Sequence, residues 1–97
     1  MIYGLYAMRD IRTGFLSPTL DVSDASAIRN FEHAVAHNDD SLFFSHPEDY
    51  SLFKIAEYDS NTGTITPIDK VELATAASIV SKLLAEYHHK EVPPQDA

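Results

Sequence analysis

The chain has 97 residues, of which 44% are hydrophobic, so it can form a single domain with a modest core. Seven Lys and Arg residues against fifteen Asp and Glu residues give a formal net charge of -8, which disfavours non-specific DNA binding by the whole surface. The lack of cysteine excludes disulfides and thiolate zinc sites, and no apolar run approaches the roughly 20 residues that span a bilayer.

The chain is predicted to begin with a β-hairpin. Residues 1–9 alternate between two sides that are both fairly apolar, which indicates a central strand. Residues 10–14 then predict a turn in which Gly14 adopts a positive φ. A second strand is expected over residues 15–22, and Pro18, which has no amide hydrogen to donate, places part of it at an edge or bulge.

A helix is expected to follow the hairpin. It begins after Ser23 or Asp24, because either side chain can accept a hydrogen bond from the free amides of the first turn. It runs to about residue 37 and ends at residues 38–40, where Asn tolerates the left-handed conformation of a helix terminus. The apolar stripe of this helix consists of Ile28, Phe31 and Val35, with Ala27 and Ala34 beside them.

The middle of the chain is predicted to form a second hairpin. Residues 41–44 indicate an extended connector that buries its aromatic side chains, and residues 45–49 a single helical turn with Pro47 at its first position. A third strand is expected over residues 50–58, with Tyr58 on the same side as Lys54, and a hairpin loop over residues 59–63.

The second hairpin is expected to end in a short edge strand over residues 64–68. Residues 69–72 (DKVE) match a capping box, which predicts a last helix from there to about residue 87. The fold class is therefore α+β, with the order β-β-α-β-β-α and an antiparallel sheet with two helices packed on one face. Residues 1–88 would form this single domain, and residues 89–97 a flexible C-terminal tail.

Catalytic and metal sites are not indicated by the residue pattern. His33 and His37 share a helix face and could chelate zinc with His46 or Asp39, but a solvated pair near a helix C-terminus explains them as well. The carboxylates between residues 48 and 59 fit capping and hairpin roles better than a glycosidase pair, and three glycines cannot supply a phosphate-binding loop. We therefore expect no enzyme, no cofactor and no metal.

The tyrosines raise the possibility of nucleic-acid binding, because aromatic platforms with basic neighbours hold single strands. The alternative is that these aromatic residues fill the core or a dimer interface. The residues that would form the nucleic-acid surface are Tyr3, Arg9, Arg12, Arg29, Tyr50, Lys54 and Tyr58.

Several segments together resemble one protein family. They are residues 27–31 (AIRNF), 46–50 (HPEDY), 52–59 (LFKIAEYD) and 62–63 (TG), which follow an opening strand. In this combination, over about residues 1–68, the chain resembles the small nonstructural protein of gokushoviruses, the single-stranded DNA phages of the Microviridae. The resemblance implies a phage protein absent from the virion, described in the family as nonstructural or DNA-binding, and it assigns no catalytic residue.

Two functions follow from the resemblance and the charge. In the first, the protein is a non-enzymatic adaptor that binds a viral or host replication or packaging protein in the host cytoplasm, as a homodimer and without a membrane. In the second, it binds single-stranded DNA directly through the tyrosine-bearing sheet face. The net charge of -8 favours the first function over tight, non-specific coating of DNA.

Overall fold

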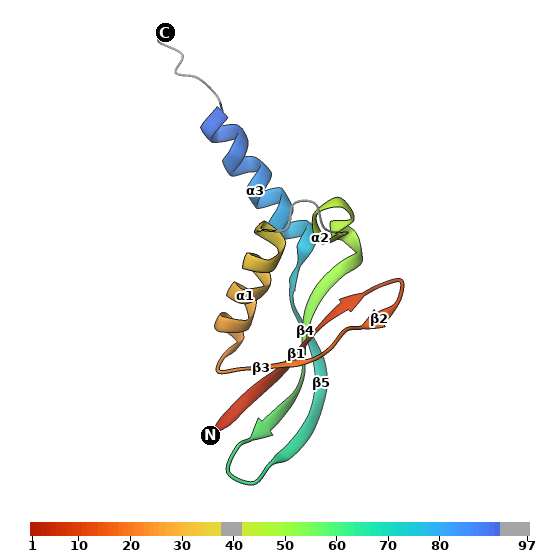
Figure 1. Cartoon of the computed structure of the whole chain (residues 1–97), viewed down its shortest axis with the longest axis vertical. Coiled ribbons are helices and arrows are strands. Elements are labelled where there is room, and N and C mark those ends of the chain that lie inside the picture. Colours follow the sequence, from red (N-terminus) through yellow and green to blue (C-terminus); the bar gives the residue numbers. More distant parts are fainter. Residues whose placement is uncertain (38–41, 92–97) are drawn as a thin grey trace.

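A computed structural model describes residues 1–37 and 42–91. A curled antiparallel sheet lies against helices on one side, in agreement with the predicted α+β class (Figure 1). Its strand order is β2-β1-β4-β5, and β3 also pairs with β1. The strands are β1 (Ile2–Asp10), β2 (Gly14–Phe15), β3 (Thr19–Asp21), β4 (Tyr50–Asp59) and β5 (Thr64–Thr75).

The predicted first hairpin is confirmed, with one change. Strand β1 is central, as its two apolar sides indicated, and Gly14 has the expected positive φ of 105°. The expected strand over residues 15–22 is divided into β2 and β3, which pair with different parts of β1. Pro18 lies between the two, where its missing amide hydrogen removes no ladder bond.

Helix α1 (Asp24–Ala36) has the predicted start and apolar stripe. Ser23 is the N-cap, and its side-chain oxygen accepts a hydrogen bond of 3.1 Å from the Ser26 amide. Phe31 and Val35 are buried, as the stripe requires. The expected terminus at residues 38–40 lies outside the described residues.

The connector before β4 differs from the prediction. Residues 42–45 form a short helix, α2 (Leu42–Ser45), in place of an extended segment. In this helix, Phe43 and Phe44 pack against the core. The Phe43 ring meets the Tyr50 ring edge-on, with 4.9 Å between the ring centroids. The helical turn that follows is confirmed as a 3-10 helix (Pro47–Asp49) with Pro at its start.

The prediction for the last strand and helix was wrong at their boundary. Strand β5 continues through the expected capping box to Thr75, and α3 (Ala76–Glu91) begins at residue 76. The first half of the ten-residue β4 pairs with residues 71–75, and this pairing with a distant strand overrides the local helix preference of these residues. Thr75 caps the helix instead, because its hydroxyl oxygen accepts a hydrogen bond of 3.1 Å from the Ser78 amide.

The core lies between the sheet and the helices. It combines Tyr6, Tyr50 and Leu52 of the sheet with the buried side chains of the two long helices. The helical contribution comes from Ala27, Phe31, Val35, Ala76, Ile79 and Val80. Among the α3 side chains whose burial the structure describes, those of the first turns make this contact, and the later turns of the helix project beyond the sheet (Figure 1). It runs past residue 88, the predicted end of the domain, and residues 92–97 of the predicted tail lie outside the described residues.

Candidate binding face

The two faces of the sheet have different surroundings. One face packs against the helices and carries Tyr6, Tyr50 and Leu52. Because successive side chains of a strand point to opposite faces, the neighbours of these residues point away from the helices. Residues opposite each other on antiparallel strands share a face, so the strand register identifies the other members of this second face.

We call this second side of the sheet the open face. It receives residues from all the strands, and the core that includes the helices contains none of them. Its members are Tyr3, Leu5, Ala7, Arg9, Phe15, Leu20, Ser51, Phe53, Ala56, Tyr58, Ile65, Pro67, Glu72 and Thr75.

Aromatic and aliphatic side chains dominate the open face. Tyr3 lies opposite Tyr58, and Tyr58 lies opposite Ile65, so the three form one row across the sheet. Phe15 and Phe53 meet edge-to-face with 5.5 Å between ring centroids. Phe15 remains 44% exposed and Ile65 57% exposed, values similar to those of Ile2 (54%) and Val71 (49%) on the other face.

Two small residues form the floor of the open face. Ala7 is 2% exposed and Ala56 is 4% exposed, yet neither belongs to the core shared with the helices. Both lie between rows of larger side chains on the same face. The larger side chains therefore already shield part of this surface and form a continuous apolar layer.

The open face carries little charge. Arg9 and Glu72 are its charged members, and both side chains are exposed. Neither forms an ion pair with another residue in the part of the chain that the structure describes. They help to line a hollow of about 310 Å³ together with Phe53 and residues at the start of β4. The rest of the chain holds the excess of carboxylates, so the face differs from its surroundings in charge as well as in polarity.

The proposed nucleic-acid residues are divided among several surfaces. Tyr3, Arg9 and Tyr58 lie on the open face. Tyr50 is buried in the core on the other face, and Arg29 is exposed on α1. Their role in binding nucleic acid stays a prediction, but the geometry brings three of the seven residues to one surface.

The remaining two cations have acidic partners. Arg12 lies in the turn after β1, where its Nε donates to Asp49 at 3.2 Å. Lys54 is on the helix-covered face, with its Nζ at 3.7 Å from an Asp24 carboxylate oxygen and 3.5 Å from one of Glu57. Arg12 and Lys54 are therefore not members of the open face.

A register shift explains why Lys54 and Tyr58 point to opposite faces. The pairing between β1 and β4 is regular on both sides of Ile55, but Leu5 lies opposite Ala56 while Tyr6 lies opposite Lys54. The extra residue on β4 is a β-bulge, which reverses the alternation beyond it. The prediction that Lys54 and Tyr58 share a face assumed a regular strand and was wrong for this reason.

Sequence reasoning missed Phe15, Leu20, Phe53 and Ile65 as members of a functional surface. Phe15 and Leu20 belong to strands too short to show alternation. Ile65 lies opposite Tyr58, and the β-bulge in β4 determines which face Tyr58 occupies, so the face of Ile65 could not be read from the sequence. The available signal was the second apolar side of residues 1–9, which indicates a surface that helices on one side cannot cover.

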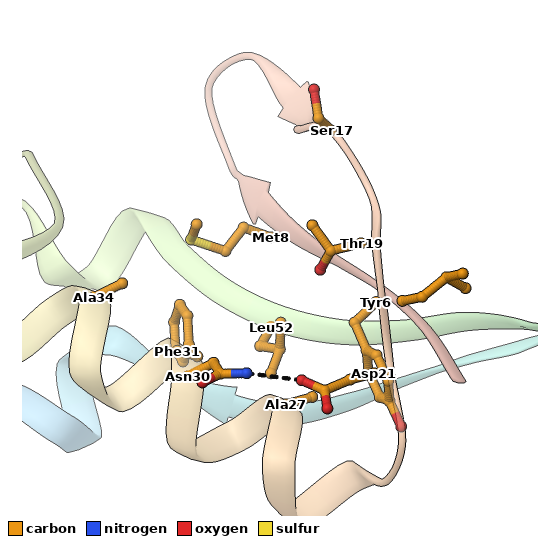
Figure 2. Close-up of a pocket in the computed structure, with 11 residues that line it drawn as sticks. Tyr6, Met8, Ser17, Thr19, Asp21, Ala27, Asn30, Phe31, Ala34 and Leu52 are labelled. Carbon is orange, nitrogen blue, oxygen red and sulfur yellow. Dashed lines mark hydrogen bonds between the residues drawn. The ribbon is translucent and has the colours of Figure 1, made fainter. Parts of the chain in front are cut away.

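A groove lies on the helix-covered side, between α1 and the stretch that contains Ser17 and β3 (Figure 2). It has a volume of about 340 Å³, with Met8, Phe31 and Leu52 among its lining side chains. At its rim, the Asn30 amide nitrogen donates to an Asp21 carboxylate oxygen at 2.8 Å. Hydrogen bonds from Ser26, the Val22 amide and Asn30 lower the pKa of Asp21, so this carboxylate is ionised and already occupied.

Tyr6 connects the sheet to the start of α1. Its hydroxyl donates to an Asp24 carboxylate oxygen at 2.6 Å, and its ring lies over Gly4. Burial first, and then the hydrogen bond and charge of Asp24, raise the pKa of Tyr6. A phenol whose pKa is raised holds its proton, so this pair stabilises the fold and is poorly suited to act as a base.

The described residues contain no group of three or more His, Asp or Glu side chains that could hold a metal ion. The imidazoles of His33 and His37 lie 4.2 Å apart between ring centroids on the exposed surface of α1. Asp39, one of the additional ligands considered, lies outside the described residues. Within residues 1–37 and 42–91, no helix has the length and apolar character needed to cross a membrane.

Comparison with known proteins identifies a family for this chain. The model of the phage ORF5 protein family matches residues 3–79, which include β1 from its second residue, the other four strands, α1, α2 and the beginning of α3. No curated protein and no solved structure matches the chain. The matched region covers most of the sequence, and the chain therefore belongs to the phage ORF5 protein family.

Proposed function

We propose that this phage protein acts without catalysis, as a nonstructural homodimer that binds a viral or host replication or packaging protein during synthesis or packaging of viral single-stranded DNA. Membership of the phage ORF5 family and the resemblance to gokushovirus nonstructural proteins support this role. Its site of action would be the host cytoplasm.

The observation that carries the homodimer in this proposal is the open face. A layer of apolar and aromatic side chains, of which Phe15, Leu20 and Ile65 are exposed, on an otherwise acidic chain is typical of a surface that contacts protein. Of the cations considered for DNA binding, Arg9 alone lies on this face. Protein contact therefore explains the arrangement with fewer assumptions than phosphate contact.

Affinity capture of the tagged full-length chain from infected cells tests this function. We expect a replication or packaging protein to be retained after nuclease treatment, because the contact does not require DNA. Loss of every captured protein on nuclease treatment would contradict the proposal and indicate that DNA is the link.

Direct binding of single-stranded DNA is the second candidate. It is favoured by the pairing of Tyr3 with Tyr58 across β1 and β4, with Arg9 on the same face, because bases stack on such rings. Fluorescence polarisation with a labelled oligonucleotide across a salt series tests it. Micromolar binding that weakens as salt increases would support it, and no binding at low salt would exclude it.

A further inference from the structure

We infer that the open face is the contact between two copies of this chain, packed about a two-fold axis so that Arg9 of each copy pairs with Glu72 of the other. The inference rests on the proposed homodimer and identifies its surface. Three observations support it: the charge of the face, its apolar layer, and the positions of its two charged residues.

Charge determines which surface two copies can bring together. Each chain has a formal net charge of -8, so two copies repel each other through most of their surfaces. The open face differs, because the members that the strand register assigns to it include one cation and one carboxylate, although Glu48 and Asp49 lie beside them in the hollow of about 310 Å³. An isologous contact through this face adds no net charge to the interface, whereas contact through the carboxylate-rich remainder would.

The apolar layer supplies the attraction. Packed sheets lie about 10 Å apart, a distance that the side chains of two such layers fill by interdigitating. Phe15, Leu20 and Ile65 remain substantially exposed on a single copy and would be covered in this packing. Strand spacings of about 4.8 Å and residue spacings of about 3.3 Å give the face dimensions of roughly 20 by 20 Å.

That size indicates a reversible dimer. Two such faces amount to roughly 800 Å², which is below the roughly 1,200–2,000 Å² that stable interfaces bury in total and is typical of weak, transient contacts. We therefore expect a dissociation constant in the micromolar range, on the order of 10 µM.

Symmetry places the two charged residues within reach of each other. A two-fold axis parallel to the strands lays β1 of one copy over β4 of the other, and β5 over the edge formed by β2 and β3. Arg9 lies opposite Ser51, and Glu72 opposite Phe53, two residues further along β4. Arg9 is then displaced from the other copy's Glu72 by about 5 Å across the strands, about 7 Å along them and about 10 Å between the sheets, or about 13 Å in all, which two long side chains reaching toward each other can bridge.

The pairing is reciprocal, so each dimer contains the same contact twice. Because neither residue has an ion-pair partner within the described part of its own chain, both are available to a second copy. Reversal of one charge should place like charges opposite each other at both contacts. Reversal of both charges in the same chain should restore the attraction, because position 9 then carries the negative charge and position 72 the positive charge.

Sedimentation equilibrium from about 1 µM to 1 mM, a range that brackets the expected constant, tests the inference on the full chain. The variants are R9E, E72R and the double variant, with R29E on α1 and E86R on α3 as controls that change the net charge equally. Arg29 and Glu86 are exposed and lie outside the open face. Circular dichroism and thermal unfolding of each variant establish that it is folded.

We expect R9E and E72R each to weaken self-association by about tenfold or more, and the double variant to return to within about threefold of the wild type. The controls should change it by less than about threefold. A wild type that is monomeric at 1 mM, single variants that match their controls, or a double variant weaker than both single variants would overturn the inference.

Two further outcomes separate this inference from the proposed function. A monomeric wild type that still captures a replication or packaging protein after nuclease treatment contradicts the contact between copies and retains the partner. A monomeric wild type that binds an oligonucleotide through Arg9, as shown by loss of binding in R9E and not in R29E, overturns the inference in favour of DNA on the same face.

Discussion

The two faces of the sheet use similar residues in opposite ways. On the helix-covered face, Tyr6 and Tyr50 are buried and hold their phenols in the core. On the open face, Tyr3 and Tyr58, on the same two strands, are only partly covered. Aromatic content alone therefore does not locate a functional surface in this chain. The deciding quantity is which face of the strand a side chain occupies, and a single bulge decides that for Tyr58.

The largest difference between the faces is expected for phenylalanine truncation. Phe31→Ala removes a ring that is 4% exposed and should lower the free energy of unfolding by about 3–5 kcal/mol. Phe15→Ala removes a ring that is 44% exposed and should cost about 1 kcal/mol or less in the monomer. Urea denaturation at low micromolar concentration, followed by far-UV circular dichroism, measures both. Equal losses would mean that the open face is part of the core.

A smaller effect is expected where β1 passes under Tyr6. A Cβ atom at Gly4 would collide with the Tyr6 ring, so Gly4→Ala should displace the ring from Asp24. We expect a loss of about 1–3 kcal/mol, typical of overpacking in a core. The double variant Gly4→Ala/Tyr6→Ala provides the control, because with the ring removed the added methyl should cost much less. A full additional loss in that background would place the strain elsewhere.

The hydroxyl of Tyr6 should contribute less than its ring. Tyr6→Phe removes the hydrogen bond to Asp24 and should cost about 1–2 kcal/mol at neutral pH. Tyr3→Phe is the matched change on the open face, where no hydrogen bond of the Tyr3 hydroxyl to the described residues is present, and it should be nearly neutral. Equal effects at the two positions would contradict the difference between the faces.

The same tyrosine should make the fold sensitive to alkali. Burial and Asp24 raise the pKa of Tyr6 in the folded state, and burial and Asp10 raise that of Tyr50. The folded chain therefore keeps protons that the unfolded chain releases near pH 10. The stabilisation is complete below that pH and is lost as the pH rises above it. Thermal unfolding between pH 8 and about 11 should show a steeper decline for the wild type than for Tyr6→Phe.

Local patterns were sufficient to predict much of the fold. The glycines at 14 and 63 both have the expected positive φ, and Ser23 caps α1. The capping pattern of residues 69–72 gave a wrong start for the last helix. Such a pattern describes a local preference, whereas β4 pairs with β5 along most of its length. The open face was only partly predictable, since its membership depends on bulges set by pairing between distant strands.

The central claim is that the open face, and not the helix-covered side, meets a second copy. Tyrosine-labelled protein examined by NMR over a dilution series from about 1 mM to 10 µM, which spans the expected dissociation constant, tests it most directly. The ring signals of Tyr3 and Tyr58 should shift with concentration, while those of Tyr6 and Tyr50 stay constant. Concentration-dependent shifts of Tyr6 and Tyr50, or no shift at any tyrosine, would contradict the account.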